Sequence, residues 1–209
     1  MRGLANPDSK IYALLNKAVQ LLELSIYVLL CCLPVITAGA AISSMHAVLL
    51  KIYRDEEKRI AGDYFSAMKS NLKNGTFLWL LYWLFLGMLA GLWILVGQRF
   101  PAGEVYFLYG LLLAAVLGLL YLDWALILQS RYVYTVGQCL KNALLAWMKH
   151  PGSTIVYLIS TVIPVLFCFS LEMLPLAVLS VPAAHLISTT LYSQVFDRME
   201  GLPLRIPKL

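Results

Sequence analysis

The sequence predicts an all-α protein that crosses a membrane several times, and three observations lead to this fold class. Of the 209 residues, 61% are apolar and only 13% are charged, and the mean hydropathy is +0.78. A soluble domain of this length does not bury so large a share of apolar side chains. Several stretches long enough to cross a bilayer carry no charge, and nearly all basic residues fall on one side of them.

The first charge-free stretch runs from residue 24 to residue 50 and is too long for one crossing. About 20 helical residues cross a hydrocarbon core of about 30 Å. Pro34 and Gly39 interrupt the stretch, and Pro and Gly in such a run are typical of a turn. We therefore expect two helices joined by a tight turn between Pro34 and Gly39, the first beginning near residue 10.

Four further charge-free stretches extend the prediction to about six transmembrane helices. The connections between them are too short for a separate soluble domain, so we expect a single membrane domain over residues 1–209. The predicted spans cover approximately residues 10–33, 40–54, 76–98, 105–128, 151–171 and 175–196.

The basic residues orient these spans, because Lys and Arg accumulate in short cytoplasmic loops. With six spans and both termini in the cytoplasm, Arg99 is the only one of the 16 basic residues outside. A five-span alternative, with residues 24–50 as one crossing, also places Arg2, Lys10 and Lys17 outside. The six-span prediction is favoured, in the cell membrane with both termini cytoplasmic. The net charge of +5 is then an inner-surface bias and requires no nucleic acid.

The N-terminus has a second interpretation, as a signal peptide. Basic residues precede an apolar stretch, and Ala38-Gly39-Ala40 resembles a cleavage site. Glu23 interrupts the apolar stretch and the region before it is long, so we favour a transmembrane helix.

Two cytoplasmic connections have the pattern of amphipathic helices that lie at the membrane surface. In the first, Asp63 is expected to cap a helix that breaks at Gly75. In the second, Thr135 is expected to cap a helix that breaks at Pro151. The predicted architecture is therefore three helical hairpins joined by two interfacial helices.

Small residues recur at every fourth position in the predicted third and fourth spans. Such spacing lets helix backbones approach closely in a membrane. The partner is expected to be the other helix of the same hairpin, and a homodimer is the alternative. The residues are Gly87, Gly91, Gly110, Ala114 and Gly118.

Polar residues inside the spans are the candidates for function, because burying them in lipid is costly. A shared polar interior lined by Glu23, His46, Asp123 and His185 would hold a substrate, water or protons. Each also has a structural interpretation: Glu23 as a partner of Lys17 or of another helix, Asp123 as a hydrogen-bond acceptor, and the two histidines as partners of backbone or hydroxyl groups.

The sequence favours no enzymatic function. It contains no HExxH, GxSxG or phosphate-binding glycine motif. The cysteines have neither CxxC spacing nor a nearby His, so no catalytic residue, cofactor or metal is predicted. We interpret them as small apolar side chains; they are Cys31, Cys32, Cys139 and Cys168.

Several segments near the N-terminus resemble a known family. They are residues 6–10 (NPDSK), 31–41 (CCLPVITAGAA), 54–57 (RDEE), and 63–65 (DYF) with 69–71 (KSN). In these segments the chain resembles the YesL family of bacterial integral membrane proteins, a domain of unknown function. The resemblance implies a small protein of the cytoplasmic membrane, commonly encoded beside carbohydrate uptake systems of the ATP-binding-cassette type and sugar-responsive two-component regulators. It implies no catalytic or ligand residue.

Three hypotheses of function follow from these observations. The leading one is a non-enzymatic accessory or regulatory partner of a carbohydrate uptake system, which binds the permease subunits of a sugar transporter or a sensor kinase within the lipid bilayer. The alternative is a small transporter that uses the polar interior itself. The third is an intramembrane enzyme.

Overall fold

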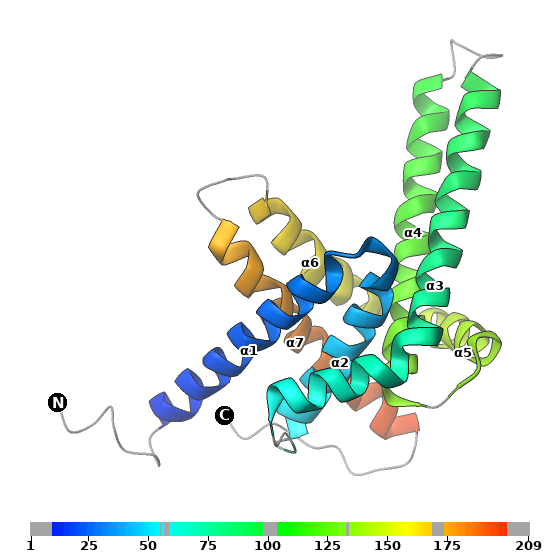
Figure 1. Cartoon of the computed structure of the whole chain (residues 1–209). Helices are drawn as coiled ribbons and strands as arrows, with labels where there is room; N and C mark the ends of the chain where they lie inside the picture. Colours follow the sequence, from blue (N-terminus) through cyan, green and yellow to red (C-terminus); the bar gives the residue numbers. More distant parts are fainter. Residues whose placement is uncertain are drawn as a thin grey trace.

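The computed structural model describes residues 10–54, 56, 59–97, 104–132, 134–168 and 174–199. These residues form seven α-helices and one short 3₁₀ helix, without a strand, which confirms the predicted all-α class. Figure 1 shows the arrangement. The elements are α1 (Lys10–Cys32), η1 (Val35–Thr37), α2 (Ala38–Arg54), α3 (Ile60–Gly97), α4 (Glu104–Arg131), α5 (Val136–Lys149), α6 (Pro151–Cys168) and α7 (Leu174–Met199).

Four segments among the described residues are long and apolar enough to cross a membrane, in agreement with a membrane protein. They are Leu15–Cys32, Val35–Arg54, Ile60–Val96 and Val105–Arg131. Crossings by α6 and α7, and hence six spans, stay predictions. The predicted outer loop around Pro101 and both chain ends lie outside the described residues.

Helix α3 corrects the prediction of a separate interfacial helix that breaks at Gly75. It is one helix of 38 residues. Asp63 does not cap it, because the helix begins three residues earlier and the Asp63 carboxylate pairs with Lys51 of α2. Figure 1 shows that α3 nevertheless changes direction, since its first part crosses the molecule and its second part runs beside α4.

Gly75 serves close packing rather than a break in the helix. A Cβ added to Gly75 would lie 2.8 Å from the Cα of Ala40. A Cβ added to Gly39 would overlap the carbonyl oxygen of Gly75 and lie 2.6 Å from the Cβ of Trp79. Glycine is therefore required on both helices where the N-terminus of α2 meets α3.

Helices α3 and α4 form a hairpin, which we call the arm; of its four predicted packing glycines only Gly118 meets the other helix, and it meets a ring rather than backbone. Aromatic side chains fill the interface: Tyr82 donates to the carbonyl oxygen of Ala115 at 3.2 Å, and a Cβ on Gly118 would lie 2.6 Å from the Phe85 ring. These rings keep the backbones apart. A Cβ on Gly87, Gly91 or Gly110 would meet nothing within 4 Å.

Helix α5 confirms the predicted cap and break. The Thr135 side chain accepts from the backbone N–H of Gln138, and the Gln138 side chain accepts from the Thr135 N–H in return. The next helix starts at Pro151, where the missing N–H costs nothing. Tyr121 of α4 donates to the carbonyl oxygen of Leu140 at 2.7 Å and ties α5 to the base of the arm.

Two apolar clusters hold the helices together. One gathers around Trp124 and Leu78, where α3, α4, α5 and α7 meet. The other gathers around Leu24, Leu49 and Tyr64, where α1, α2 and the first part of α3 meet. The space between the two clusters is where polar side chains collect.

Candidate functional site

A buried group of polar and aromatic side chains lies where α2, α4, α6 and α7 meet, and we call it the polar seam. Buried polar groups require hydrogen-bond partners, so such a group fixes how helices fit together or provides a place for chemistry. Its members are His46, Asp123, Trp124, Thr154, Ser160, His185, Ser188, Thr189 and Tyr192, all of them buried.

The centre of the seam is a pair of histidines. The rings of His46 on α2 and His185 on α7 meet edge to face, with centroids 5.5 Å apart. His46 Nδ1 lies 3.3 Å from the Thr189 hydroxyl. Helical spacing of three and four residues places His185, Ser188 and Thr189 on one side of α7. A hydroxyl contact at 3.5 Å links Ser188 to Ser160 of α6.

Trp124 connects the seam to α6. Its indole N–H donates to the Thr154 hydroxyl at 3.0 Å, and its ring meets the Tyr192 ring edge to face, with centroids 4.3 Å apart. The Tyr192 hydroxyl donates to the carbonyl oxygen of Ser153 at 3.4 Å. Asp123 is buried in the same region, close enough to Tyr192 for an electrostatic interaction.

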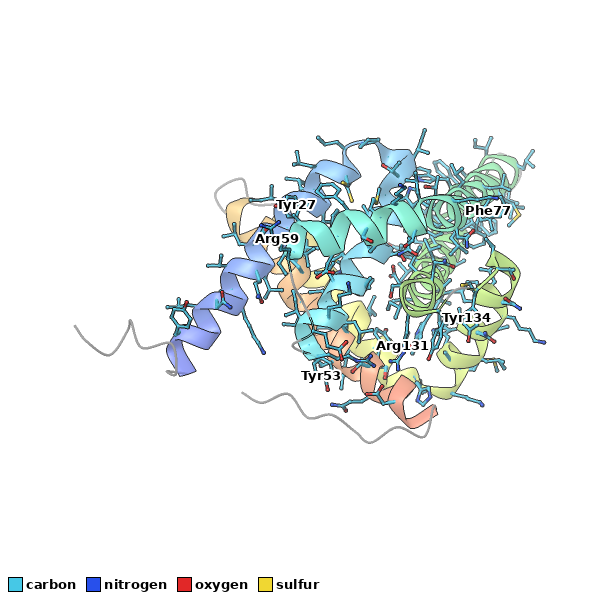
Figure 2. All side chains as sticks on the ribbon, turned by 60° about the horizontal axis from the view of Figure 1, so that its bottom comes forward. Tyr27, Tyr53, Arg59, Phe77, Arg131 and Tyr134 are labelled. Atoms are coloured by element: carbon cyan, nitrogen blue, oxygen red, sulfur yellow. The ribbon has the colours of Figure 1, made fainter. Side chains whose placement is uncertain are left out.

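An ion-pair cluster closes one end of the seam. The Asp197 carboxylate of α7 accepts from Arg54 of α2 at 3.2 Å and from Arg131 of α4 at 3.0 Å. The Asp197 side chain is only 3% exposed. Figure 2 shows Arg131 beside the last turns of α7. The carboxylate thus holds the ends of three helices together.

A small cavity lies between the histidines and the ion-pair cluster. Its volume is about 10 Å³, room for about one water molecule. It is lined by His46, Leu50, Ile127, Ser130, Arg131, Thr189, Tyr192 and Ser193. Four hydroxyls, an imidazole and a guanidinium suit a bound water. The described residues leave no space here for a sugar.

The structure groups three of the four predicted interior residues and separates the fourth. His46, Asp123 and His185 all belong to the polar seam. Glu23 instead accepts from the hydroxyl of Tyr27, one turn further along α1, at 2.9 Å. Figure 2 shows Tyr27 facing the first part of α3. Glu23 therefore has its hydrogen-bond partner on its own helix, outside the polar seam.

Sequence reasoning missed the ion-pair cluster. Arg54 and Arg131 had the pattern of inner-surface charges, and Asp197 followed the last predicted span. The available signal was a single carboxylate at the end of an apolar helix. Arg54 and Asp197 are 143 residues apart in the sequence, yet their side chains lie 3.2 Å apart. No local spacing predicts this contact.

A second, apolar site lies on the arm. A groove of about 320 Å³ runs along α3 and α4 down to α5. The hydroxyls of Tyr82 and Tyr121, which line it, bond to backbone carbonyls, so the groove presents mainly hydrocarbon. It is lined by Leu78, Leu81, Tyr82, Phe85, Gly118, Tyr121, Leu122 and Leu140. A shallower hollow continues it along α3, lined by Leu81, Trp83, Leu84, Phe85, Gly87 and Met88.

Cys139 of α5 provides a test of the packing between α4 and α5. Its thiol donates to the Gln129 side chain at 3.1 Å, and burial raises the pKa of the Cys139 thiol to about 11. The thiol stays protonated well above neutral pH, and the thiolate is the reactive form. We expect a maleimide at pH 7.5 to modify Cys139 slowly in the folded protein and rapidly after denaturation, measured by peptide mass spectrometry. Equal rates in the two states would contradict this packing.

The comparisons with known proteins give one match. A family model described as "Protein of unknown function, DUF624" matches residues 19–94, which run from α1 through most of α3. No curated protein matches the chain, and no solved structure matches it. Part of the chain, including the packed glycines of α2 and α3, is thus similar to a domain of unknown function, and the narrower YesL name stays an interpretation.

Proposed function

We propose that the chain is a non-enzymatic accessory protein of the cell membrane that binds the permease subunits of a carbohydrate uptake system. Its binding surface is the groove on the arm. The link to carbohydrate uptake rests on the resemblance to the YesL family, and the mode of binding rests on the apolar surface described above.

The observation that carries this proposal is the contrast between the two sites. The cavity in the polar seam has room for about one water, whereas the groove on the arm has a volume of about 320 Å³ and a mainly apolar lining. Transmembrane helices associate through packing of apolar and small side chains. A groove between two helices, extended by a hollow at Gly87, fits a helix of a partner better than it fits a sugar.

The placement of basic residues supports an orientation in which both termini, and the end of the groove at α5, face the cytoplasm. Fifteen of the 16 Lys and Arg side chains fall on one side if both termini are cytoplasmic. Six crossings satisfy this condition. The described part of α5, which closes the groove, carries Lys141 and Lys149 on its exposed surface. The groove would then begin at the cytoplasmic face, where the energy-coupling subunits of a transporter lie. The basic residues assigned to the cytoplasm are Arg2, Lys10, Lys17, Lys51, Arg54, Lys58, Arg59, Lys69, Lys73, Arg131, Lys141, Lys149, Arg198, Arg205 and Lys208.

The groove gives the test of this proposal. Gly87→Leu adds a side chain in the hollow at a position where a Cβ meets nothing within 4 Å. With the sugar permease subunits encoded nearest to the gene, we expect this variant to co-purify several-fold less than wild type in mild detergent, at an unchanged melting temperature. Gly152→Leu on α6, equally open, is the control that should leave co-purification intact.

Two results would reject the accessory function. One is wild type that fails to co-purify with these permease subunits at all. The other is sugar uptake by the purified protein alone in proteoliposomes, which an accessory protein does not support.

Glu23→Gln separates the accessory hypothesis from the transporter hypothesis. A Gln oxygen still accepts from Tyr27, so we expect the fold and co-purification to survive. If Glu23 carried protons or cations instead, the same change would abolish uptake by the protein alone and leave the fold intact. The two readouts, co-purification and uptake into partner-free vesicles, are measured on wild type and variant side by side. Uptake that requires Glu23 would favour the transporter.

A further inference from the structure

Helix α1 carries a line of large apolar side chains on the face that turns away from the other helices. The opposite face is buried, because Leu21, Leu24 and Val28 pack against α2 and the first part of α3. Each side chain of the exposed line is between 46% and 63% exposed. We call this line the α1 stripe, and its members are Tyr12, Leu15, Val19, Leu22, Ile26 and Leu29.

The α1 stripe has the seven-residue repeat of a coiled coil, since it advances alternately by three and four residues. Val19 and Ile26 occupy position a of the repeat, and leucines occupy position d. Among the residues of α1 whose burial the structure describes, every other exposed residue falls at e or g, the positions that flank a and d. These flanking residues are Asn16, Ala18 and Leu30. The exposed face therefore has the register of a surface that pairs with another helix.

The branching of the side chains alternates along the α1 stripe as well. Within the candidate span Leu15–Cys32, position a holds the β-branched residues Val19 and Ile26. Position d holds leucine in each repeat, at Leu15, Leu22 and Leu29. β-Branched residues at a with leucine at d favour a parallel pair of helices over larger bundles. Lipid tails are about as apolar as leucine, so contact with lipid does not require this alternation.

The outer part of α3 shows that an exposed apolar helix need not carry such a repeat. Four consecutive side chains are exposed there, so apolar groups surround the helix instead of forming one line. They are Leu92, Trp93, Ile94 and Leu95. The repeat on α1 is therefore a feature of that helix and not a consequence of exposure alone.

A carboxylate at the edge of the α1 stripe also favours a second helix over lipid. Glu23 lies near the middle of the candidate span Leu15–Cys32 and is partly exposed. Ionisable side chains inside a membrane almost always face protein or a water-filled cavity. Glu23 occupies position e, and in a parallel pair position e faces position g of the other helix, here Ala18. The small Ala18 side chain leaves room for the longer Glu23 side chain, which the second helix would shield from lipid.

We propose that two copies of the chain pair in the membrane through their α1 stripes, as a parallel two-stranded coiled coil. Copies of one protein share one orientation in the membrane, and a two-fold axis brings the same surface of each copy together. Figures 1 and 2 show that α1 begins at the edge of the molecule, on the opposite side from the arm. The groove on the arm is lined by α3, α4 and α5, so the pair leaves it free for a helix of the permease.

Disulfide cross-linking in native membranes tests the pairing. Cysteine replaces Leu22 in a protein whose native cysteines are replaced and which retains its melting temperature. Two d positions face each other across a parallel pair, close enough for a disulfide. After oxidation we expect Leu22→Cys to form a covalent dimer. Leu113→Cys on α4, where Leu113 is 61% exposed, is the matched control and should stay monomeric.

The mass of the protein in mild detergent gives a second readout, measured by light scattering during size-exclusion chromatography. We expect wild type to be a dimer. The double variant Leu22→Ala with Leu29→Ala shortens two side chains that are exposed in the single chain, so it should be a monomer with unchanged helix content by circular dichroism. Leu113→Ala is the control that should remain a dimer.

Three outcomes would overturn the proposal. If Leu22→Cys forms no more covalent dimer than Leu113→Cys, or if wild type is a monomer, lipid covers the α1 stripe. If oxidation joins Leu22→Cys to a different protein, the stripe binds another partner. If the double alanine variant remains a dimer, another surface holds the two copies together. Co-purification with permease subunits and its loss in Gly87→Leu concern the arm, so the accessory function is tested separately.

Discussion

Gly39→Leu is expected to destabilise the protein strongly. The new side chain would meet the backbone of Gly75 and the Cβ of Trp79. Neither can rotate aside, because both belong to the rigid frame of α3. Overpacking commonly costs about 1–3 kcal/mol, and a clash with backbone belongs at the upper end of that range. Gly75→Leu should behave alike, since its Cβ would lie 2.8 Å from the Cα of Ala40. Thermal unfolding in detergent measures both.

Gly91→Leu is the matched control for these variants. It lies on the same helix as Gly75, and a Cβ there meets nothing within 4 Å. Its melting temperature should therefore match that of wild type. Gly118→Leu should fall between the two, because the Phe85 ring that it meets has room to rotate. Equal losses for Gly39→Leu and Gly91→Leu would show that the close contact between α2 and α3 does not exist.

Local sequence signals predicted the parts of the fold that depend on neighbours in the chain. Pro34 correctly marked the turn between α1 and α2, and Thr135 correctly marked the start of α5. Gly75 led to a wrong prediction, because an isolated glycine is typical of a helix break. Here its backbone packs on α2 and the helix continues. The same choice of residue serves a turn or a close approach, and only the partner helix decides.

The candidate site shows the same difference between local signals and contacts that are remote in sequence. Polar residues in apolar stretches pointed to His46, Asp123 and His185, because their burial requires partners wherever those partners lie. No local pattern predicts which helices supply the partners. Glu23 bonds within its own helix, whereas the ion-pair cluster joins three helix ends that are remote in sequence.

Asp197→Asn is expected to cause the largest loss of stability among the polar substitutions. The carboxylate is 3% exposed and neutralises two guanidinium groups, of which Arg131 is 9% exposed. Removing one partner of a buried ion pair costs about 3–5 kcal/mol, because the remaining charge stays buried without compensation. Arg54 is 22% exposed and retains some hydration, so we expect a loss toward the lower end, measured as reduced thermal stability in detergent.

Asp63→Asn is the matched control, since it breaks an ion pair whose Lys51 side chain is 43% exposed. Exposed pairs contribute about 0.2–1 kcal/mol, so this change should barely lower the melting temperature. A rescue distinguishes charge from packing. Adding Arg131→Gln to Asp197→Asn removes one of the two guanidinium charges that face residue 197, and the double variant should be more stable than Asp197→Asn alone. If Asp197→Asn costs no more than Asp63→Asn, the three helix ends are held by apolar packing and the ion-pair cluster is incidental.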